Sequence, residues 1–327
     1  MPQDGLVRVT PAVQPMLDSQ RLGARPYSLS ALQKFATCPY QFLLSAIYRL
    51  QPNDEPEPLQ RLDPLTRGAL FHEVQAEFFR SMQAHGRLPL AAAGVPEAIR
   101  RVNRTLADVA AAYRERLAPA IERVWREEIA AIGRDLRVWV RRLPDAGEWR
   151  PSYFEFSFGL SDEGRDPRSV SEPVTIDGRF RLRGSVDLVE VRHNAQVRVT
   201  DHKTGKNRST PRMVIGGGGT LQPVLYGMAM EEVLGKPVVS GRLFYCTAAG
   251  AFTEHEIPLT EANRRAGLEA LEIVDRAIEL GFLPPAPAAR ACTWCDFRAV
   301  CGPDEARRVA RKPPEPLGDL QALRERP

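Results

Sequence analysis

The sequence predicts an α/β fold in which a mixed β-sheet is flanked by helices. Three observations support this class. Residues 28–142 carry helical patterns, residues 151–203 carry alternating strand patterns, and the residues from 221 onward mix the two. No change in composition is sharp enough to divide the 327 residues into two domains. We therefore expect one large domain with a substantial core.

Composition and charge narrow the class of protein. The chain has 43% apolar and 26% charged residues, which is typical of a soluble globular protein. Its net charge of +4 is a mild basic bias that is compatible with a nucleic-acid partner. We find no signal peptide, and no apolar run approaches the roughly 18 residues that span a bilayer. The sequence thus predicts a cytoplasmic protein that does not bind membranes.

The N-terminal part predicts a leader and then helices. Residues 1–27 are polar and lack periodicity, so we expect a flexible leader. Residues 28–50 predict two short helices, with Pro39 in the first turn of the second. A charged, proline-rich loop over 51–64 then leads to a helix over about 66–85.

The remaining chain predicts a helical insertion, a run of strands and a tail. Residues 96–142 form one or two amphipathic helices inside the domain, which extends over 28–305. Residues 306–327 are basic and proline-rich, and we expect a mobile tail. The further predicted elements are strands over 152–160, 179–191, 196–203 and 240–248, and helices over 221–235 and 260–281.

Two of these strands predict a pair of facing carboxylates. The segments on both sides of "RHNAQ" read as a hairpin, with Asn194 at the centre of its turn. Cross-strand partners then have residue numbers that sum to 388, as Asp187 and Asp201 do. Their Cβ atoms would lie about 4.5–5.5 Å apart. Lys203 projects to the same face as Asp201, because side chains alternate along a strand.

Facing carboxylates repel each other unless a positive charge lies between them. Lys203 can offset part of the repulsion, and a divalent cation such as Mg²⁺ would offset it better. A cation beside a lysine favours hydrolysis of a phosphate ester, although a third ligand is still missing. A solvent-facing ladder of ion pairs on the hairpin is the open alternative.

The same residues resemble a known family. Asp187 followed by "DHK" at 201–203 resembles the motif of the PD-(D/E)XK nucleases, and "GSVD" and "DHKTG" are similar to their RecB-like branch. That branch also carries Gly-x-x-x-His upstream, as in Gly68 to His72. The resemblance implies a restriction-endonuclease-like mixed sheet and a site for Mg²⁺ or Mn²⁺.

The resemblance also implies a role for each site residue. The implied ligands of the cation are the side chains of His72, Asp187 and Asp201 and the backbone carbonyl of His202. Lys203 would be the catalytic lysine. Gln222 and Tyr226, four positions apart on one helix face, match the Gln-x-x-x-Tyr element and would hold the substrate backbone or the active site. Glu155 matches an acidic residue that this branch often has on a preceding strand.

Four of the five cysteines form a second pattern. Cys38 lies next to a proline, and a C-x-x-C-x5-C group lies near the C-terminus. That group is Cys292, Cys295 and Cys301. Four thiolates can hold either zinc or a [4Fe–4S] cluster. The resemblance favours the iron–sulfur cluster, as a structural clasp between the two ends of the domain. Cys246, in an apolar strand, is expected in the core.

The pattern over residues 28–305 resembles most the nuclease domain of AddB-type subunits of helicase–nucleases, which process broken DNA ends. The resemblance implies a DNA nuclease for single strands or DNA ends in repair and recombination, either stand-alone or excised from a larger subunit, with a helicase as a possible partner. A scaffold that binds DNA or a partner without cutting is the alternative. Redox gating by the cysteines has no support beyond the cysteines themselves.

Overall fold

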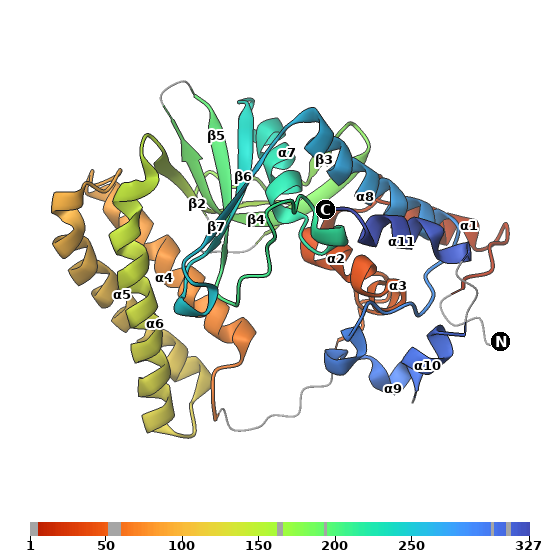
Figure 1. Cartoon of the computed structure of the whole chain (residues 1–327), viewed down its shortest axis with the longest axis horizontal. Coiled ribbons are helices and arrows are strands. Elements are labelled where there is room, and N and C mark those ends of the chain that lie inside the picture. The colour runs from red at the N-terminus through yellow and green to blue at the C-terminus, as the bar shows by residue number, and fades with distance from the viewer. Residues whose placement is uncertain (1–5, 52–59, 162–165, 193–194, 302–303, 312–314) are drawn as a thin grey trace.

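A mixed β-sheet lies between two groups of helices (Figure 1). The computed structural model describes residues 6–51, 60–161, 166–192, 195–301, 304–311 and 315–327. The strands are β1 (Tyr27–Ser28), β2 (Arg150–Phe158), β3 (Val174–Ile176), β4 (Phe180–Val191), β5 (Val197–Lys203), β6 (Val238–Tyr245) and β7 (Glu254–Pro258). The predicted mixed α/β class is confirmed.

Helices cover both faces of this sheet. α4, α5 and α6 lie on one side, and α7, α8, α2 and α11 lie on the other (Figure 1). The helices are α1 (Gln14–Gln20), α2 (Leu29–Thr37), α3 (Pro39–Phe42), α4 (Pro64–Ala84), α5 (Val95–Leu117), α6 (Glu122–Arg142), α7 (Gln222–Leu234), α8 (Glu261–Glu279), α9 (Arg298–Cys301), α10 (Glu305–Val309) and α11 (Gly318–Arg324). No helix in the described ranges is both long and apolar enough to cross a bilayer.

β4 is the strand that organises the sheet. The strand order is β1-β4-β5-β6-β7, and β2 and β3 also pair with β4. β4 pairs in parallel with β1 and antiparallel with β2, β3 and β5, whereas β5 and β6 are parallel. β4 pairs with four strands because it is long: its first residues pair with β1 and β3, and its later residues pair with β2 and β5.

The register of β4 and β5 agrees with the register expected from the hairpin. The paired residues run from Leu188 with Thr200 to Val191 with Val197, and every pair sums to 388. The turn residues on which that expectation was based, His193 and Asn194, lie outside the described residues.

The alternation in "QVRVTDHK" indicates a strand with one face turned inward, but both faces of β5 are buried. Val197 and Val199 join the core on one face, and Arg198 and Thr200 on the other face are also buried. The reason is position: β5 lies between β4 and β6, and helices cover both faces of the sheet. Buried polar side chains on this face must find partners.

Two hydrophobic clusters flank the sheet. The larger one joins the sheet to α2, α7, α8 and α11. The other is made by α4, α5 and α6 together with Phe154, Leu188, Phe244 and Cys246 of the sheet region. Cys246 is fully buried, as expected for a core residue. The expected helical region over 96–142 is thus the pair α5 and α6, which builds one wall of the molecule.

Both ends of the chain are packed more closely than the sequence suggests. The described part of the leader contains α1, whose Leu17 is buried, and Arg21 binds Asp275 of α8 at 2.5 Å. In the tail, Leu320 and Leu323 of α11 are buried against the core. A few well-placed leucines fix these segments, although neither is long enough to show a clear period.

Candidate active site

Three carboxylates lie side by side across β2, β4 and β5. The residues on both sides of Glu155 in β2 pair with the residues on both sides of Asp187 in β4, so the two carboxylates are level. Leu188 pairs with Thr200 of β5, which places Asp201 level with Asp187 from the other side. The side chains of all three are largely buried.

The backbone of Glu155 is strained. Its φ of 54° lies in the left-handed region, which a glutamate rarely adopts and which costs of the order of 1–3 kcal/mol. At this residue β2 crosses from one hydrophobic cluster to the other, since Phe154 packs with the α4–α6 side and Phe156 with the opposite side. Ser185 of β4 donates a hydrogen bond to Glu155 Oε2 at 3.0 Å. Strain of this kind is typical of functional positions.

α4 brings His72 to the carboxylates. Asp63 caps the helix by accepting hydrogen bonds from the amides of Leu65 and Thr66, at 2.8 and 3.0 Å. A Cβ atom on Gly68 would lie 3.3 Å from Thr204 Oγ1, so the glycine lets the helix approach the end of β5. His72 lies one turn further along, on the same helix face. The Gly-x-x-x-His spacing thus has a direct physical reason.

His72, Glu155 and Asp187 form a compact group of ligand atoms. His72 Nδ1 lies 3.4 Å from Asp187 Oδ2 and 3.9 Å from Glu155 Oε1. Among the described residues, this is the one set of three or more His, Cys, Asp or Glu side chains whose ligand atoms all lie within 4.8 Å of one another. Asp201 is not part of it.

β5 supplies a lysine and a backbone donor. Lys203 Nζ lies 2.7 Å from Asp201 Oδ2, as expected for neighbours on one strand face. The amide of His202 donates a hydrogen bond to Asp187 Oδ2 at 2.6 Å and so fixes that carboxylate. The imidazole of His202 is buried, with its ring centroid 6.2 Å from that of His72. Burial lowers the pKa of His202 to about 3, so this imidazole is neutral.

The charges at the site are strongly coupled. Burial alone would lower the pKa of His72, but Asp187, Glu155 and Asp201 outweigh it and raise this pKa to about 9. Burial would raise the pKa of Asp187, but His72 and the His202 amide hold it at about 2. For Asp201, burial and the Asp187 charge outweigh Lys203 and raise the pKa. The site therefore tolerates one more positive charge near Asp201 and Asp187.

α7 places Tyr226 beside the row of carboxylates. A Cβ atom on Gly184 of β4 would lie 2.9 Å from Tyr226 Oη, so the glycine of "GSVD" makes room for the ring. Burial raises the pKa of Tyr226, and Asp201 and Asp187 raise it further. Gln222, one turn earlier, instead exchanges hydrogen bonds with Gln33 of α2, at 2.7 and 3.2 Å. The structure thus brings Tyr226 to the site and ties Gln222 to α2.

A cleft of about 710 Å³ opens onto the group of ligand atoms. α4 forms one wall through Gly68, His72 and neighbouring residues, and Asp187 and Lys203 lie at the other. The cleft is lined mainly by polar side chains and is open to solvent, so it can admit an extended polar substrate.

The four cysteines of the second pattern lie together, in a cavity that shares no lining residue with this cleft. Cys38, Cys292, Cys295 and Cys301 all line one small cavity, together with Phe297 and other apolar side chains. Each of the four is partly exposed. The chain therefore brings the predicted cysteines to one place, between the start of α3 and the segment from Ala291 to Cys301.

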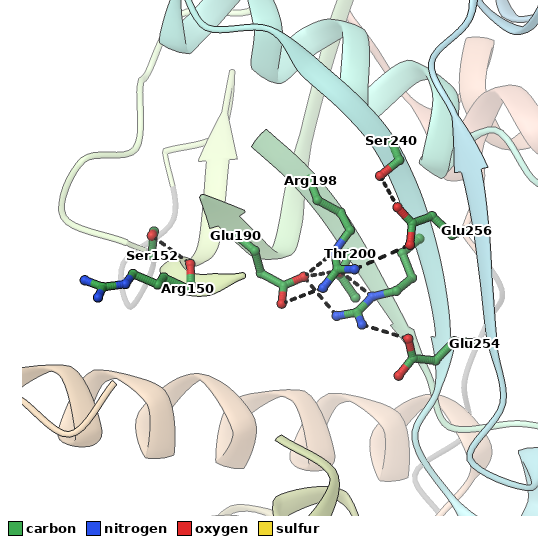
Figure 2. A network of polar contacts seen from close by, with 9 residues as sticks. Arg150, Ser152, Glu190, Arg198, Thr200, Ser240, Glu254 and Glu256 are labelled. Atoms are coloured by element: carbon green, nitrogen blue, oxygen red, sulfur yellow. Dashed lines mark hydrogen bonds and ion pairs between the residues drawn. The ribbon is translucent and has the colours of Figure 1, made fainter. Parts of the chain in front are cut away.

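A buried ion-pair network lies on the same strands as the carboxylates, three residues further along β4 from Asp187. Glu190 of β4 accepts hydrogen bonds from Arg198, Arg242 and Thr200, at 2.9–3.0 Å. Figure 2 shows Glu190 pointing toward Arg198 and Thr200 of β5, with Glu254 and Glu256 at the far side. Glu190 is 1% exposed, and the two arginines are 5% and 6% exposed. This network was not predicted from the sequence, where the alternating charges in "VEV" and "VRVT" are its only signal.

A comparison with known protein families supports the predicted family. A family model described as the PD-(D/E)XK nuclease superfamily matches residues 26–302, well over half of the chain. The chain belongs to the PD-(D/E)XK nuclease superfamily. The predicted family is therefore confirmed.

Two curated relatives of this chain support the RecB-like branch. Both are described as subunits of an "ATP-dependent helicase/deoxyribonuclease", from Lacticaseibacillus casei and Lacticaseibacillus paracasei. Each is 25% identical over 229 residues, which cover 67% of this chain and 19% of the relative. The chain thus matches about a fifth of their length. A solved structure described as the crystal structure of SSO0001 is 14% identical, covers 84% of this chain and 95% of its own, and has a TM-score of 0.30, too low to support an inference.

Proposed function

We propose that this nuclease hydrolyses phosphodiester bonds of DNA with the help of a divalent cation, acting on single strands or DNA ends during repair or recombination. One observation carries the proposal: His72, Glu155 and Asp187 gather their ligand atoms in the lining of an open polar cleft. An exonuclease acting on ends is consistent with a cleft that is open to solvent.

The residues fit Mg²⁺ or Mn²⁺. Two carboxylates and an imidazole are common ligands of hard and borderline cations, and the imidazole gives Mn²⁺ an advantage because Mg²⁺ binds oxygen almost exclusively. Asp201 and the backbone carbonyl of His202 would complete the set that the family motif implies. When bound, the cation supplies Lewis-acid chemistry: it offsets charge on phosphate oxygens and makes water a better nucleophile at neutral pH.

The other side chains of the site would orient the attacking water or the substrate, or hold the strands and helices of the site in place. Lys203 stays protonated beside Asp201, so its Nζ can donate a hydrogen bond to an attacking water or to a phosphate oxygen. Asp187 cannot rotate freely while the His202 amide holds it. Tyr226, packed on Gly184, supports β4 at the site, and Gln222 fixes the start of α7. These residues fix the geometry on which phosphoryl chemistry depends.

The identity of the substrate and the partner is drawn from the relatives. Their name includes a deoxyribonuclease and an ATP-dependent helicase, which supports DNA as substrate and a helicase subunit or domain as partner. The alternative is a scaffold that holds DNA without cutting. The presence of Asp187, Asp201 and Lys203 together argues against it, because a non-cutting descendant needs none of them.

For the four-cysteine cavity we propose a [4Fe–4S] cluster rather than zinc. Thiolates around tetrahedral zinc lie about 3.8 Å apart, given a Zn–S bond of about 2.3 Å. No three of these sulfur atoms gather within 4.8 Å of one another in the described chain, so they are spaced more widely than zinc requires. Bound there, the cluster would tie α3 to the C-terminal segment and so clasp the two ends of the domain, without a part in bond cleavage.

Cleavage of labelled oligonucleotides tests the proposal. We expect single-stranded DNA to be degraded with Mn²⁺ or Mg²⁺ and to survive in a chelator. Asp187→Asn and Lys203→Met should each lower the rate by about 10³-fold or more, since a lost metal or charge contact contributes several kcal/mol to the barrier. Glu77→Gln is the matched control, because Glu77 lines the same cleft but pairs with Arg80 outside the group of ligand atoms.

Two results would contradict the proposal. If Asp187→Asn and Lys203→Met cut as fast as the wild type, these residues do not carry the chemistry. If the wild type binds DNA tightly but cuts under no divalent cation, the scaffold function replaces the nuclease function.

A further inference from the structure

Arg324 of α11 reaches between the two segments that carry the four cysteines. Its Nε donates a hydrogen bond to the carbonyl of Ala36 at 2.8 Å. Its Nη2 donates to the carbonyl of Thr37 at 3.1 Å and to that of Ala286 at 2.6 Å. One guanidinium therefore joins residues that are about 250 positions apart in the sequence.

These three carbonyls belong to the framework of the four-cysteine cavity. Thr37 immediately precedes Cys38, and Ala286 lies between Pro285 and Pro287, which both line the cavity. The amide of Ala288 also donates to the Thr37 carbonyl, at 2.8 Å. Arg324 therefore fixes the position of Cys38 relative to the segment that leads to the other three cysteines.

The charge of Arg324 has no carboxylate partner among the described residues. Elsewhere in the same tail, Arg326 forms an ion pair with Glu269. Arg324 is partly buried and bonds to carbonyls alone. Burial lowers its pKa, and the Cys38 thiol is the titratable group near enough to oppose that effect. A partly buried guanidinium without a carboxylate is costly unless an anion lies nearby.

We propose that Arg324 is a positioning residue of the four-thiolate site: it braces the two cysteine-bearing segments and supplies the positive charge that offsets the thiolates. The inference rests on the proposed function in one respect, that the four thiols hold a metal centre. Groups beyond the ligands set the orientation and charge balance of a metal centre, and nearby charge and hydrogen bonds tune the potential of an iron–sulfur cluster.

Three variants of the full chain separate bracing from charge. Arg324→Gln removes the charge and most of the fork, and Arg324→Lys keeps the charge but cannot bridge three carbonyls. Arg326→Gln is the matched control, because it removes an equal charge two residues away in the same tail. Each protein is reconstituted with iron and sulfide without oxygen, and the release of metal to a chelator and the midpoint potential are measured.

We expect Arg324→Gln to release its metal at least tenfold faster than the wild type and to have a more negative midpoint potential, since a positive charge near the cluster favours the reduced form. Arg324→Lys should restore the potential but not the full retention. Arg326→Gln should match the wild type in both. The proposal is overturned if Arg324→Gln equals the wild type, or if Arg326→Gln changes both quantities as much.

A separate measurement distinguishes failure of the brace from failure of the metal site. If the wild type retains neither iron–sulfur nor zinc, the four-thiolate part of the proposed function is wrong. The metal-free chains then still test the brace through the rate at which a thiol reagent modifies Cys38. Faster modification in Arg324→Lys than in the wild type and Arg326→Gln supports it, because this variant keeps the charge that favours the reactive thiolate, and equal rates reject it.

Discussion

The same two strands carry two groups of buried charges that are built in opposite ways. In β4, Asp187 and Glu190 are three residues apart, and in β5, Arg198 and Asp201 are equally close. Around Glu190 every carboxylate oxygen receives hydrogen bonds from arginines or Thr200. Around Asp187 three carboxylates share the imidazole of His72 and the ammonium of Lys203.

This difference in charge pairing separates a group that stabilises the fold from a group that is suited to binding a cation. Burial costs a carboxylate several kcal/mol unless charged partners compensate. The chain provides two arginines for Glu190, which holds β4, β5 and β6 together, as Figure 2 shows for β4 and β5. It provides no arginine within 4 Å of Asp187 in the described residues, so Glu155 and Asp187 keep lone pairs that face the cleft. The unmatched acidity is what a cation site requires.

The largest expected effect is on stability. Glu190→Gln leaves Arg198 and Arg242 buried without their shared charge, and breaking a buried pair costs about 3–5 kcal/mol. We expect the free energy of unfolding in urea to fall by that amount, with cleavage per folded molecule unchanged. Asp187→Asn should do the reverse: a smaller loss of stability, because Glu155 still pairs with His72, with cleavage abolished. If folded Glu190→Gln protein loses cleavage activity, the charges around Glu190 and those around Asp187 do not have separate roles.

Acid should weaken the network in a defined direction. Burial would raise the pKa of Glu190, but Arg242 and Arg198 outweigh it and lower this pKa. The stability that Glu190 contributes is therefore complete above the pKa of an unfolded glutamate, about 4.3, and is lost as the pH falls through the lower folded value. Urea titrations between pH 7 and pH 3 should show this loss in the wild type and not in Glu190→Gln. Parallel profiles would contradict the assignment.

Glu155→Gln sharpens the comparison at the site itself. If Glu155 is a ligand, the variant should lose about 10²–10³-fold in cleavage rate, or about 2.7–4 kcal/mol of barrier. Raised Mn²⁺ should rescue it in part, because the remaining ligands still bind. A variant with wild-type rate at low Mn²⁺ would show that Glu155 serves only the backbone at this strained position.

The smallest expected effect is a gain in stability, in the variant Asp201→Asn. The pKa of Asp201 is raised, so the folded chain without a cation disfavours its charge. Asp201→Asn should therefore stabilise the metal-free protein by about 0.5–2 kcal/mol, in the range of other charge-optimising changes. Thermal unfolding in a chelator measures this change. A destabilised variant would mean that the ion pair with Lys203 contributes more than the repulsion from Asp187.

The strands and the hairpin register were predictable because they depend on local patterns. Alternation in "QVRVTDHK" and the position of the turn were enough to place Asp201 level with Asp187. Glu155 was harder, because its place beside Asp187 depends on the pairing of β2 with β4 and on a left-handed backbone that no local pattern reveals.

The sequence was least informative where distant segments meet. It suggested a loose leader and a mobile tail, yet Leu17 and Leu323 are buried, because α8 and α2 provide a surface that only the fold creates. Gln222 was expected to serve the site or the substrate, and the structure shows it paired with Gln33. The hairpin register and strand alternation suggested Asp187, Asp201 and Lys203 as a cation site, whereas the role of His72 came only from the family resemblance.

Binding of Mn²⁺, measured by calorimetry without DNA, shows whether His72 and the buried carboxylates hold a cation. We expect a Mn²⁺ site in the wild type that is retained in Glu77→Gln and lost in Asp187→Asn while that variant stays folded. Mn²⁺ binding to Asp187→Asn with wild-type affinity would contradict the claim that His72 and the buried carboxylates are assembled to hold a cation.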